Sequence, residues 1–492
     1  MNYLKHKNYF FIGIGGIGMS ALAKYLHYNK KNISGYDKVQ TNLTKKLVSS
    51  GIGVSHNLKQ SMIDLKKLNT KNTVIIYTPA ISNDNKILKY CYHKKFTVIK
   101  RAKILSEIVN DGYCIAISGT HGKTTISSIL SHILFQFNLE FTSFVGGIMN
   151  DYGSNLIING NKIFIVEADE FDKSFLELKP NVICINNIDP DHLDIYKNYQ
   201  NLINTFKAFV GNLKKDGIIF QNENLGFGGY KYGLSDKSDY YIDKLIYGPF
   251  ETQFEIKSYK NNYGKVIFGM PGKHNALNAL AAFSIAVNLN LSPKKIVNAI
   301  KSFRGIERRF SIITKSPKIL IDDYAHHPNE IKSIVDSVKK MYPNKSNLVI
   351  FQPHLFSRTK DFMSEFARAL EKFDKIWESM NELSVPVIVE GKRDISAIRQ
   401  LGYNGLLIQL NDGKSVLSTV ERIVTLFGIS SEFVILMDWD RTGIKLAKSL
   451  EKYGTSCDLN PNLQIWRDLK SLCSKDVSCV EELPTFVNML KQ

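Results

Sequence analysis

The sequence predicts a multi-domain α/β protein built on parallel sheets. Apolar strand-like runs alternate with helical stretches almost throughout, which is typical of parallel sheets with helical connections. Two glycine-rich loops, at residues 13–18 and 119–125, each follow an apolar strand and open a helix. The length of 492 residues exceeds one ordinary domain, so about three to four domains are expected.

Four domains are expected along the chain. Their predicted boundaries are 1–108, 109–302, 303–383 and 384–492. Strands that mark these domains are predicted at residues 9–14, 163–166, 182–185, 319–322 and 348–351. The polar stretch 378–384 is the predicted join between the last two domains.

Cysteine spacing, the length of apolar runs and the net charge bear on which classes of protein this chain can belong to. The six cysteines are scattered without C-x-x-C pairs, which argues against zinc ribbons and favours a reducing, cytoplasmic location. No run of about 18 apolar residues is present, so we expect no membrane span. The net charge of +18 invites a nucleic-acid partner. Basic and acidic residues balance from residue 384 onward, so the excess lies in the first part and also suits anionic nucleotide substrates.

The first glycine loop has dinucleotide-type spacing. Gly13, Gly15 and Gly18 fit the pattern G-x-G-x-x-G, and Gly16 lies within it. Asp37 ends the next predicted strand, where a ribose-binding acid is expected. The loop alone leaves NAD and another diphosphate open. A second nucleotide loop makes a phosphate-bearing substrate here, with ATP bound by the next domain, the better interpretation.

The second glycine loop predicts a nucleotide triphosphate site. Residues 115–125 read IAISGTHGKTT, an apolar strand, a tight turn and the start of an apolar helix. Backbone N–H groups of such a turn wrap phosphate, Lys123 adds a point charge, and Thr124 can hold Mg²⁺. The spacing is shorter than in the general phosphate-loop motif because Ile117 replaces the first glycine. The expected loop residues are Gly119, Thr120, His121, Gly122, Lys123, Thr124 and Thr125.

Two further polar clusters are placed to serve this loop. Glu167 and His192 each follow a predicted buried strand, so parallel pairing would bring both to the edge that carries the loop, beside Mg²⁺. A histidine bonded to a local carboxylate is the alternative for His192. His274, Asn275 and Asn278 open an alanine-rich helix and offer groups suited to a purine edge, although polar residues at a helix start are usually caps.

Eight segments together resemble the Mur ligases, the ATP-dependent amide-forming enzymes of cell-wall precursor assembly. Their order and spacing match over about residues 8–377. The segments are GIGGIGMSA (13–21), GTHGKTT (119–125), EADEFDKSF (167–175), NIDPDHLDIY (187–196), GKHNALNALA (272–281), ERRF (307–310), DDYAHHP (322–328) and FQPHLFSRTK (351–360). The first segment resembles the alanine-adding member better than the later ligases.

The resemblance implies a fold and a reaction. It implies a Rossmann-like UDP-binding domain, a P-loop-type central ATPase domain and a Rossmann-like third domain. It also implies that ATP and Mg²⁺ activate UDP-N-acetylmuramate as an acyl phosphate, which L-alanine then attacks. Each step builds negative charge, for which Lys, Arg and Mg²⁺ are suitable partners.

Matching positions carry the implied roles. Lys123 would contact the transferring phosphate, and Thr124, Glu167 and His192 would hold Mg²⁺. His274, Asn275 and Asn278 would bind adenine, and the loop 15–18 the UDP diphosphate. The remaining implied residues are Asp322 or Asp323 at the ribose, Arg309 at the hinge, and His326, His327 and Arg358 at the carboxylate and amino-acid substrates.

The resemblance stops after Trp377, and a different one follows. Residues 385–394, VPVIVEGKRD, and 433–443, FVILMDWDRTG, resemble a Toprim domain, most similar to small stand-alone archaeal Toprim proteins. This implies Glu390 as general acid/base and Asp438 and Asp440 as Mg²⁺ ligands. A plain α/β domain with surface acids is the alternative.

A ligase-like part followed by a Toprim-like part is compatible with three functions. Because the resemblance stops after Trp377, the third domain is expected to have only about half of the length usual in the family. Such a domain would leave one edge of its sheet open, so we hypothesise that the ligase is slowed or inactive. The first function is the alanine-adding ligase. The second is a Toprim-type nucleic-acid protein with a vestigial ligase part. The third is a ligase for another UDP-linked precursor. The ligase motifs cover most of the chain and favour the first.

Overall fold

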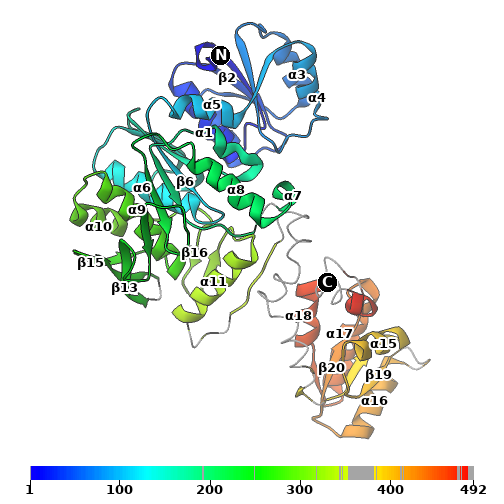
Figure 1. Ribbon diagram of the computed structural model, residues 1–492. Coiled ribbons are helices and arrows are strands. Elements are labelled where there is room, and N and C mark those ends of the chain that lie inside the picture. The colour runs from blue at the N-terminus through cyan, green and yellow to red at the C-terminus, as the bar shows by residue number, and fades with distance from the viewer. Residues whose placement is uncertain are drawn as a thin grey trace. The chain divides into compact units, whose positions relative to one another are not determined.

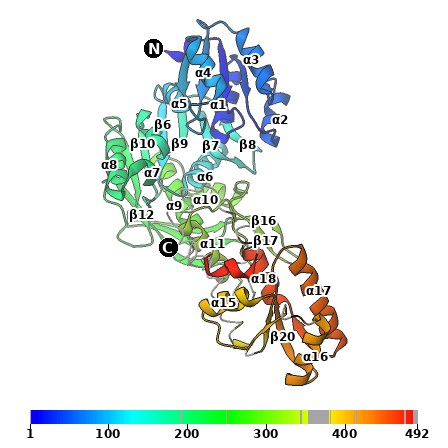
Figure 2. The same cartoon turned by 90° about the vertical axis from the view of Figure 1, so that its right-hand side faces the viewer.

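The computed structural model describes residues 2–190, 193–248, 250–316, 318–342, 345, 347–352, 380, 382–383, 385–410, 413, 415–473, 477 and 479–485. The chain forms two compact units, which are described separately. One contains Met1–Ala325 and Ser333–Leu348, and the other contains His326–Lys332 and Val349–Gln492. Figures 1 and 2 label many of their helices and strands.

The first sheet of the larger unit is parallel, with five described strands in the order β3-β2-β1-β4-β5. The strands are β1 (Asn8–Ile12), β2 (Asn32–Tyr36), β3 (Gly53–Ser55), β4 (Thr73–Tyr77) and β5 (Thr97–Lys100). The helices of this region are η1 (Tyr3–Lys5), α1 (Ile17–Tyr28), α2 (Asn42–Ser49), α3 (Leu58–Lys66), α4 (Lys86–His93) and α5 (Arg101–Val109). From β1 the strand order runs to one side through β2 and β3, and then to the other side through β4 and β5. The first glycine loop follows β1 at this switch point, where open α/β sheets bind ligands.

The second sheet has ten strands among the described residues, in the order β15-β14-β13-β12-β11-β10-β6-β9-β7-β8. The strands are β6 (Tyr113–Ser118), β7 (Phe141–Met149), β8 (Ser154–Ile158), β9 (Ile163–Ala168), β10 (Val182–Ile185), β11 (Ile218–Asn222), β12 (Tyr230–Gly233), β13 (Tyr240–Tyr247), β14 (Thr252–Ser258) and β15 (Asn262–Phe268). The helices are α6 (Lys123–Gln136), η2 (Phe171–Glu177), α7 (Leu193–Tyr196), α8 (Tyr199–Val210), α9 (Lys273–Asn288) and α10 (Pro293–Ser302). The predicted strands 163–166 and 182–185 are confirmed.

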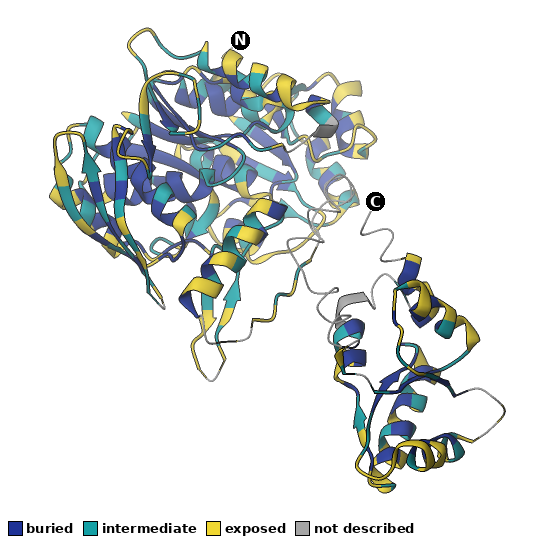
Figure 3. Cartoon of the chain, turned by 60° about the horizontal axis from the view of Figure 1, so that its bottom comes forward, coloured by how far each residue is buried: buried dark blue, intermediate teal, exposed yellow. Residues whose placement is uncertain are grey.

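Strand β6 is buried on both faces, which positions the phosphate loop that follows it. Successive side chains of a strand point to opposite faces. Ile115 and Ile117 pack in the cluster that contains α6 and α9, whereas Cys114 and Ala116 pack in the cluster that contains α1 and α8. Figure 3 shows buried strand segments within the larger unit, whereas other strand segments are intermediate or exposed. Coverage of both faces explains the continuous apolar run that predicted a parallel sheet.

The third region is small. Strands β16 (Ser311–Thr314) and β17 (Leu320–Asp322) pair antiparallel, and helix α11 (Pro328–Met341) follows. The predicted strand at 348–351 is wrong, because residues 347–352 form none and Leu348 and Ile350 are exposed. An apolar run becomes a strand only where a neighbour accepts its backbone hydrogen bonds. Ile313 and Leu320 are more than half exposed.

The second unit holds a parallel sheet whose described strands have the order β19-β18-β20-β21. The strands are β18 (Val387–Val389), β19 (Leu407–Gln409), β20 (Glu432–Leu436) and β21 (Asn460–Asn462). The helices are α15 (Lys392–Gln400), α16 (Val416–Phe427), α17 (Arg441–Ser456), α18 (Gln464–Cys473) and η3 (Val480–Glu482). Among the described helices of both units, none has the length and apolar character needed to cross a membrane.

Candidate active site

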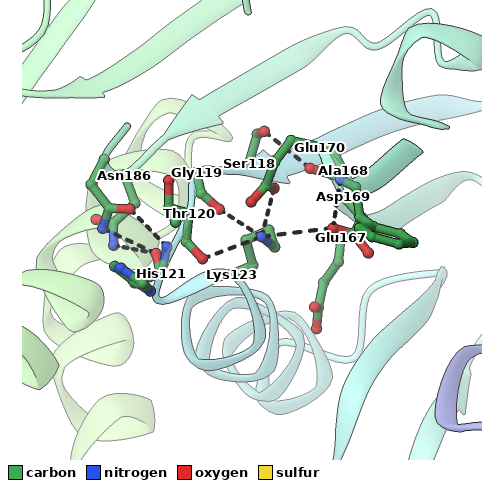
Figure 4. Close-up of polar contacts among 12 residues, drawn as sticks. Ser118, Gly119, Thr120, His121, Lys123, Glu167, Ala168, Asp169, Glu170 and Asn186 are labelled. Atoms are coloured by element: carbon green, nitrogen blue, oxygen red, sulfur yellow. Dashed lines mark hydrogen bonds and ion pairs between the residues drawn. The ribbon is translucent and has the colours of Figure 1, made fainter. Parts of the chain in front are cut away.

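The phosphate loop joins β6 to α6 and is tightly enclosed (Figure 4). Gly119 and Gly122 have φ angles of +125° and +85°, a region that favours glycine. A Cβ on Gly119 would lie 2.9 Å from backbone atoms of Asn187, and one on Gly122 would overlap the Asn186 side chain. The loop therefore needs these glycines to bring its backbone around an anion.

Two asparagines after β10 hold the loop from the neighbouring strand. The Asn187 side-chain oxygen accepts the His121 N–H at 2.7 Å, and its carbonyl accepts the Thr120 N–H at 3.1 Å. Asn186 Nδ2 donates to the His121 carbonyl at 2.9 Å, and Tyr232 donates to Asn186 Oδ1 at 2.8 Å. The predicted loop 119–125 thus lies at the carboxyl edge of β6 and β10 and is fixed by the two asparagines that follow β10.

Lys123, the first residue of α6, turns back over the loop (Figure 4). Its ammonium group donates to the carbonyl oxygens of Gly119 at 2.7 Å and Thr120 at 3.4 Å, and to Glu170 Oε2 at 2.7 Å. Asp169 Oδ1 is farther, at 3.9 Å. Burial by itself lowers the pKa of Lys123, but the nearby carboxylates, Glu170 first, outweigh it and raise the pKa above its ordinary value. The loop therefore contains a charged ammonium group on a side chain that is only 15% exposed.

Glu167 lies near the end of β9, directly beside β6. Thr124 Oγ1 donates to its Oε2 at 3.0 Å, Ser127 Oγ donates to Oε1 at 3.2 Å, and the Gly146 N–H also donates to Oε1. Burial raises the pKa of Glu167, and the Gly146 N–H and the charge of Lys123 offset part of this effect. A carboxylate enclosed in this way is stabilised by a bound cation.

Thr124 and Glu167 fit an Mg²⁺ ion beside a triphosphate. They present adjacent oxygen donors, and Mg²⁺ usually takes one or two protein ligands together with phosphates and water. Within the described ranges, no group of three or more His, Cys, Asp or Glu residues is arranged to hold a metal ion, so phosphate oxygens would complete the coordination. His192, the other predicted ligand, lies outside the described residues. Its pairing with Glu167 stays a prediction.

The three predicted adenine-binding residues open α9, as expected. Asn275 and Asn278 are buried. Asn275 Nδ2 donates to the Pro271 carbonyl at 2.7 Å, and Asn278 Oδ1 accepts from Asn186 Nδ2 at 3.2 Å. His274 Nδ1 lies 2.8 Å from the hydroxyl of a serine on α11. Asn278 is therefore linked to the phosphate loop through Asn186, and the adenine role of all three stays a prediction.

The predicted hinge and ribose residues lie between the central and third regions. Asp323 Oδ2 accepts the Phe310 N–H at 2.7 Å. Asp322 Oδ2 lies 3.5 Å from Arg308 Nε. The Arg309 guanidinium lies 5.6 Å from the centre of the Tyr324 ring. Asp323 therefore fixes the backbone at Phe310, while the ribose role of the aspartates and the hinge role of Arg309 stay predictions.

The first glycine loop, residues 13–18, forms a turn between β1 and α1, as predicted. Asp37 Oδ2 accepts the Gly15 N–H at 2.8 Å, so this carboxylate supports the loop directly. A Cβ on Gly18 would lie 2.9 Å from Arg101 Nη1. A guanidinium group beside a helix start is suited to a diphosphate, which agrees with the predicted UDP contact of this loop.

Three other predicted residues belong to the second part of the chain. His327 is buried in the second compact unit, and its Nδ1 accepts the Asn329 N–H at 3.2 Å. His326 lies in the same unit, where its Nδ1 is 3.5 Å from Glu330. Arg358 lies outside the described residues. Their substrate roles stay predictions.

Acidic residues gather at the carboxyl ends of β18 and β20 in the second unit. Glu390 directly follows β18, and Asp438 and Asp440 follow β20. Burial raises the pKa of Glu390, and the charges of Asp438, Asp394 and Asp440 raise it further. Asp440 Oδ1 also caps α17 by accepting a backbone N–H at 2.7 Å. The parallel pairing of β18 with β20 accounts for this cluster.

Replacing Asp394 by asparagine is expected to stabilise the second unit above pH 6. Burial raises the pKa of Asp394 from 3.8 to about 6, so folding favours the protonated form. The resulting stability is complete below the unfolded pKa and is lost as the pH rises through about 6, with up to about 3 kcal/mol at stake. All three tryptophans lie at residue 377 or later, so their fluorescence during heating follows this unit. A midpoint equally pH-dependent in Asp394→Asn and the unaltered chain would contradict the assignment.

Several site residues were not predicted. The EADEFDKSF segment predicts no separate role for Glu170, yet this residue is the carboxylate paired with Lys123. No motif points to Ser127, although its hydroxyl donates to Glu167. Asn186 and Asn187 had no assigned role and hold the loop. Their position directly after a buried strand was the available signal.

Comparison with known families finds matches along most of the chain. Residues 8–113 match the model for the "Mur ligase family, catalytic domain". Residues 117–286 match the "Mur ligase middle domain", and residues 308–382 match the "Mur ligase, glutamate ligase domain". The C-terminal segment after residue 384 lies beyond these matches.

Similar proteins carry one recurrent description. The UDP-N-acetylmuramate–L-alanine ligase of Christiangramia forsetii is 42% identical over 379 residues, covering 77% of this chain and 83% of that protein. The ligase of the same description from Flavobacterium psychrophilum is 43% identical, covering 76% and 84%. The crystal structure of a UDP-N-acetylmuramate–alanine ligase from Thermotoga maritima has a TM-score of 0.65 at 26% identity, covering 92% of this chain and all of that one.

Proposed function

The chain belongs to the Mur ligase family, and from that membership we propose its reaction. It is an ATP-dependent, ADP-forming ligase that joins L-alanine to UDP-N-acetylmuramate, a step of cell-wall precursor synthesis. The sequence identity of 42% and 43% to two ligases of this description over most of the chain supports the substrate pair. The alternative nucleic-acid function for the whole chain is not favoured.

One structural observation carries the proposal. Lys123, Thr124 and Glu167 converge at neighbouring strand ends around a glycine loop whose backbone can enclose a phosphate. Transfer of a phosphoryl group to the muramyl carboxylate, and the following attack by the alanine amine, both build negative charge. A buried ammonium group beside a hydroxyl–carboxylate pair supplies positive charge for both steps.

The chain's own residues divide the work. Backbone N–H groups of Gly122, Lys123 and Thr124 would bind the triphosphate, since those of Thr120 and His121 donate to Asn187. The Lys123 ammonium group would neutralise charge on the phosphoryl group as it transfers. Thr124 and Glu167 would hold Mg²⁺, which supplies further charge neutralisation when bound. The first glycine loop, supported by Asp37, would bind the UDP diphosphate with Arg101 beside it.

Phosphate release by the intact chain tests this reaction. We expect release only when ATP, UDP-N-acetylmuramate and L-alanine are all present, and little release with UDP-N-acetylglucosamine, glycine or L-serine in their place. Release that does not need the muramyl nucleotide, or that is faster with another UDP-linked acceptor, would contradict the assignment. The shortened third domain motivates our hypothesis of slow turnover. A rate near the enzyme median of about 10 s⁻¹ would refute that part alone.

We propose a second role for the C-terminal domain, as a Toprim-type Mg²⁺ site. The observation in its favour is that Glu390, Asp438 and Asp440 directly follow two adjacent parallel strands. Because the described residues form no group of three side chains arranged to hold a metal ion, an ion here would take at most two of these carboxylates together with water. In the part of the chain that the structure describes, Glu390 Oε2 is buried without a hydrogen-bond partner. Burial and the charges of neighbouring acids raise the pKa of Glu390, and a carboxylate in such surroundings is stabilised by a divalent cation.

Mg²⁺ is expected to raise the melting temperature of the second unit at pH 8, as followed by tryptophan fluorescence. The ion neutralises repulsion among the ionised carboxylates, so Asp438→Asn should abolish most of the increase. Asp458→Asn, which alters an exposed acid of the same unit, is the matched control. An equal Mg²⁺ effect in all three proteins would rule out this site. Salt-dependent binding of single-stranded DNA that Asp438→Asn removes would extend the role to nucleic acid.

A further inference from the structure

The ammonium group of Lys123 has all its donors engaged by the protein. An ammonium carries three N–H donors. Two point at the loop carbonyls of Gly119 and Thr120, and the third points at Glu170 Oε2, 2.7 Å away. Figure 4 shows these contacts converging on the lysine from the loop and from the segment after β9. A phosphate that takes a hydrogen bond from Lys123 must therefore replace one of the three acceptors.

Glu170 is held in place by its own surroundings. It is 2% exposed, in contrast to Asp169, whose side chain is 42% exposed and whose Oδ1 lies 3.9 Å from Lys123. The Glu170 carbonyl accepts the hydroxyl of Tyr196 and the Lys173 N–H at 2.9 Å. A carboxylate buried this deeply is stable only when paired. Glu170 is thus a fixed acceptor for Lys123, whereas Asp169 is not.

We propose that Glu170 is a positioning residue for Lys123. Its carboxylate holds the ammonium group against the loop carbonyls and releases it only as charge builds on the transferring phosphoryl group. This inference rests on the proposed function and deepens the same site. Glu170 acts through Lys123 and touches no substrate.

The physical reason is the difference between ground state and transition state. Only an interaction that is stronger in the transition state than in the ground state accelerates the chemical step. A lysine that is hydrogen-bonded to a buried carboxylate stabilises bound ATP only weakly in the ground state. In the transition state the phosphoryl group carries more negative charge, so it competes better with Glu170 for the ammonium group and is stabilised more strongly. Holding the long lysine stem in one geometry also avoids an ordering cost at the moment of reaction.

Glu170→Gln in the intact chain is therefore expected to separate binding from turnover. The dissociation constant for Mg²⁺-ATP, measured by calorimetry, should fall about threefold to tenfold, while kcat in phosphate release should fall about tenfold or more. Glu170→Asp, which keeps the carboxylate, should recover most of kcat. In a Lys123→Ala background, Glu170→Gln should leave the ATP affinity unchanged, because the carboxylate acts through the lysine. Glu177→Gln removes an exposed pair with Lys103 and serves as the control.

Two results would overturn the inference. One is a Glu170→Gln chain whose ATP affinity and kcat both stay within about twofold of the unaltered chain, since a shared lysine must respond. The other is weaker ATP binding together with a lower melting temperature, which indicates a structural pair only. If the unaltered chain binds ATP but releases no phosphate, the proposed reaction fails, and the affinity cycle with Lys123→Ala still decides the role of Glu170. Absence of ATP binding would contradict both.

Discussion

Replacing Lys123 by alanine is expected to lower kcat/KM for ATP by about 10³-fold. The ammonium group is the positive charge at the centre of the phosphate loop, held by Gly119, Thr120 and Glu170. No other lysine or arginine side chain among the described residues has a hydrogen bond to the 119–123 loop in the structure. The measurement is phosphate release by the intact chain with saturating UDP-N-acetylmuramate and L-alanine. A loss smaller than about tenfold would mean that another group neutralises the transferring phosphoryl.

The same substitution is expected to destabilise the larger unit. Removing one partner of a buried ion pair leaves the other charge uncompensated and typically costs about 3–5 kcal/mol. Glu170 would be that uncompensated charge, because it is 2% exposed. Adding Glu170→Gln to Lys123→Ala should restore much of the melting temperature without restoring activity.

A lysine elsewhere provides the control for both effects. Lys103 forms an ion pair with Glu177 at 3.1 Å, and both side chains are nearly half exposed. Surface pairs of this kind contribute about 0–1 kcal/mol, so Lys103→Ala should change neither activity nor stability appreciably. If Lys123→Ala and Lys103→Ala behaved alike, the loop lysine would have no special role.

The meeting of Lys123, Thr124 and Glu167 was predictable from sequence because it depends on backbone geometry. Buried parallel strands can be recognised as continuous apolar runs, and the carboxyl ends of neighbouring strands meet at one edge. The loop follows β6 and Glu167 lies near the end of β9, which pairs with β6 in parallel. The distance along the chain between the two does not affect this argument.

The partners of these residues were not predictable in the same way. Glu170 and Asp169 are neighbouring acids in one motif, and only the fold buries the first and leaves the second half exposed. The strand expected at 348–351 failed for a related reason, because an apolar run does not reveal whether a neighbouring strand is present. The sequence pattern predicts at which edge of a sheet a residue lies. Tertiary packing decides which side chains it contacts there.

Glu167→Gln is expected to abolish most activity while leaving the fold intact, with kcat lower by about 10²–10³-fold. The amide retains one oxygen to accept the Gly146 N–H and one NH₂ group that can donate to the Thr124 hydroxyl, so the local hydrogen bonds can survive. The negative charge that would hold Mg²⁺ is lost. The Mg²⁺ concentration for half-maximal phosphate release should therefore rise about tenfold or more.

Stability and activity are expected to move in opposite directions in this variant. Burial raises the pKa of Glu167, so at neutral pH and without Mg²⁺ the ionised carboxylate costs the fold stability, and a neutral amide removes that cost. The melting temperature measured in EDTA should stay equal or rise, whereas the unaltered chain should gain more from added Mg²⁺-ATP. Glu140→Gln, which alters an exposed partner of Lys162, should change neither quantity. A Glu167→Gln chain that melts lower in EDTA would show that the carboxylate is a structural anchor and that the Mg²⁺ site lies elsewhere.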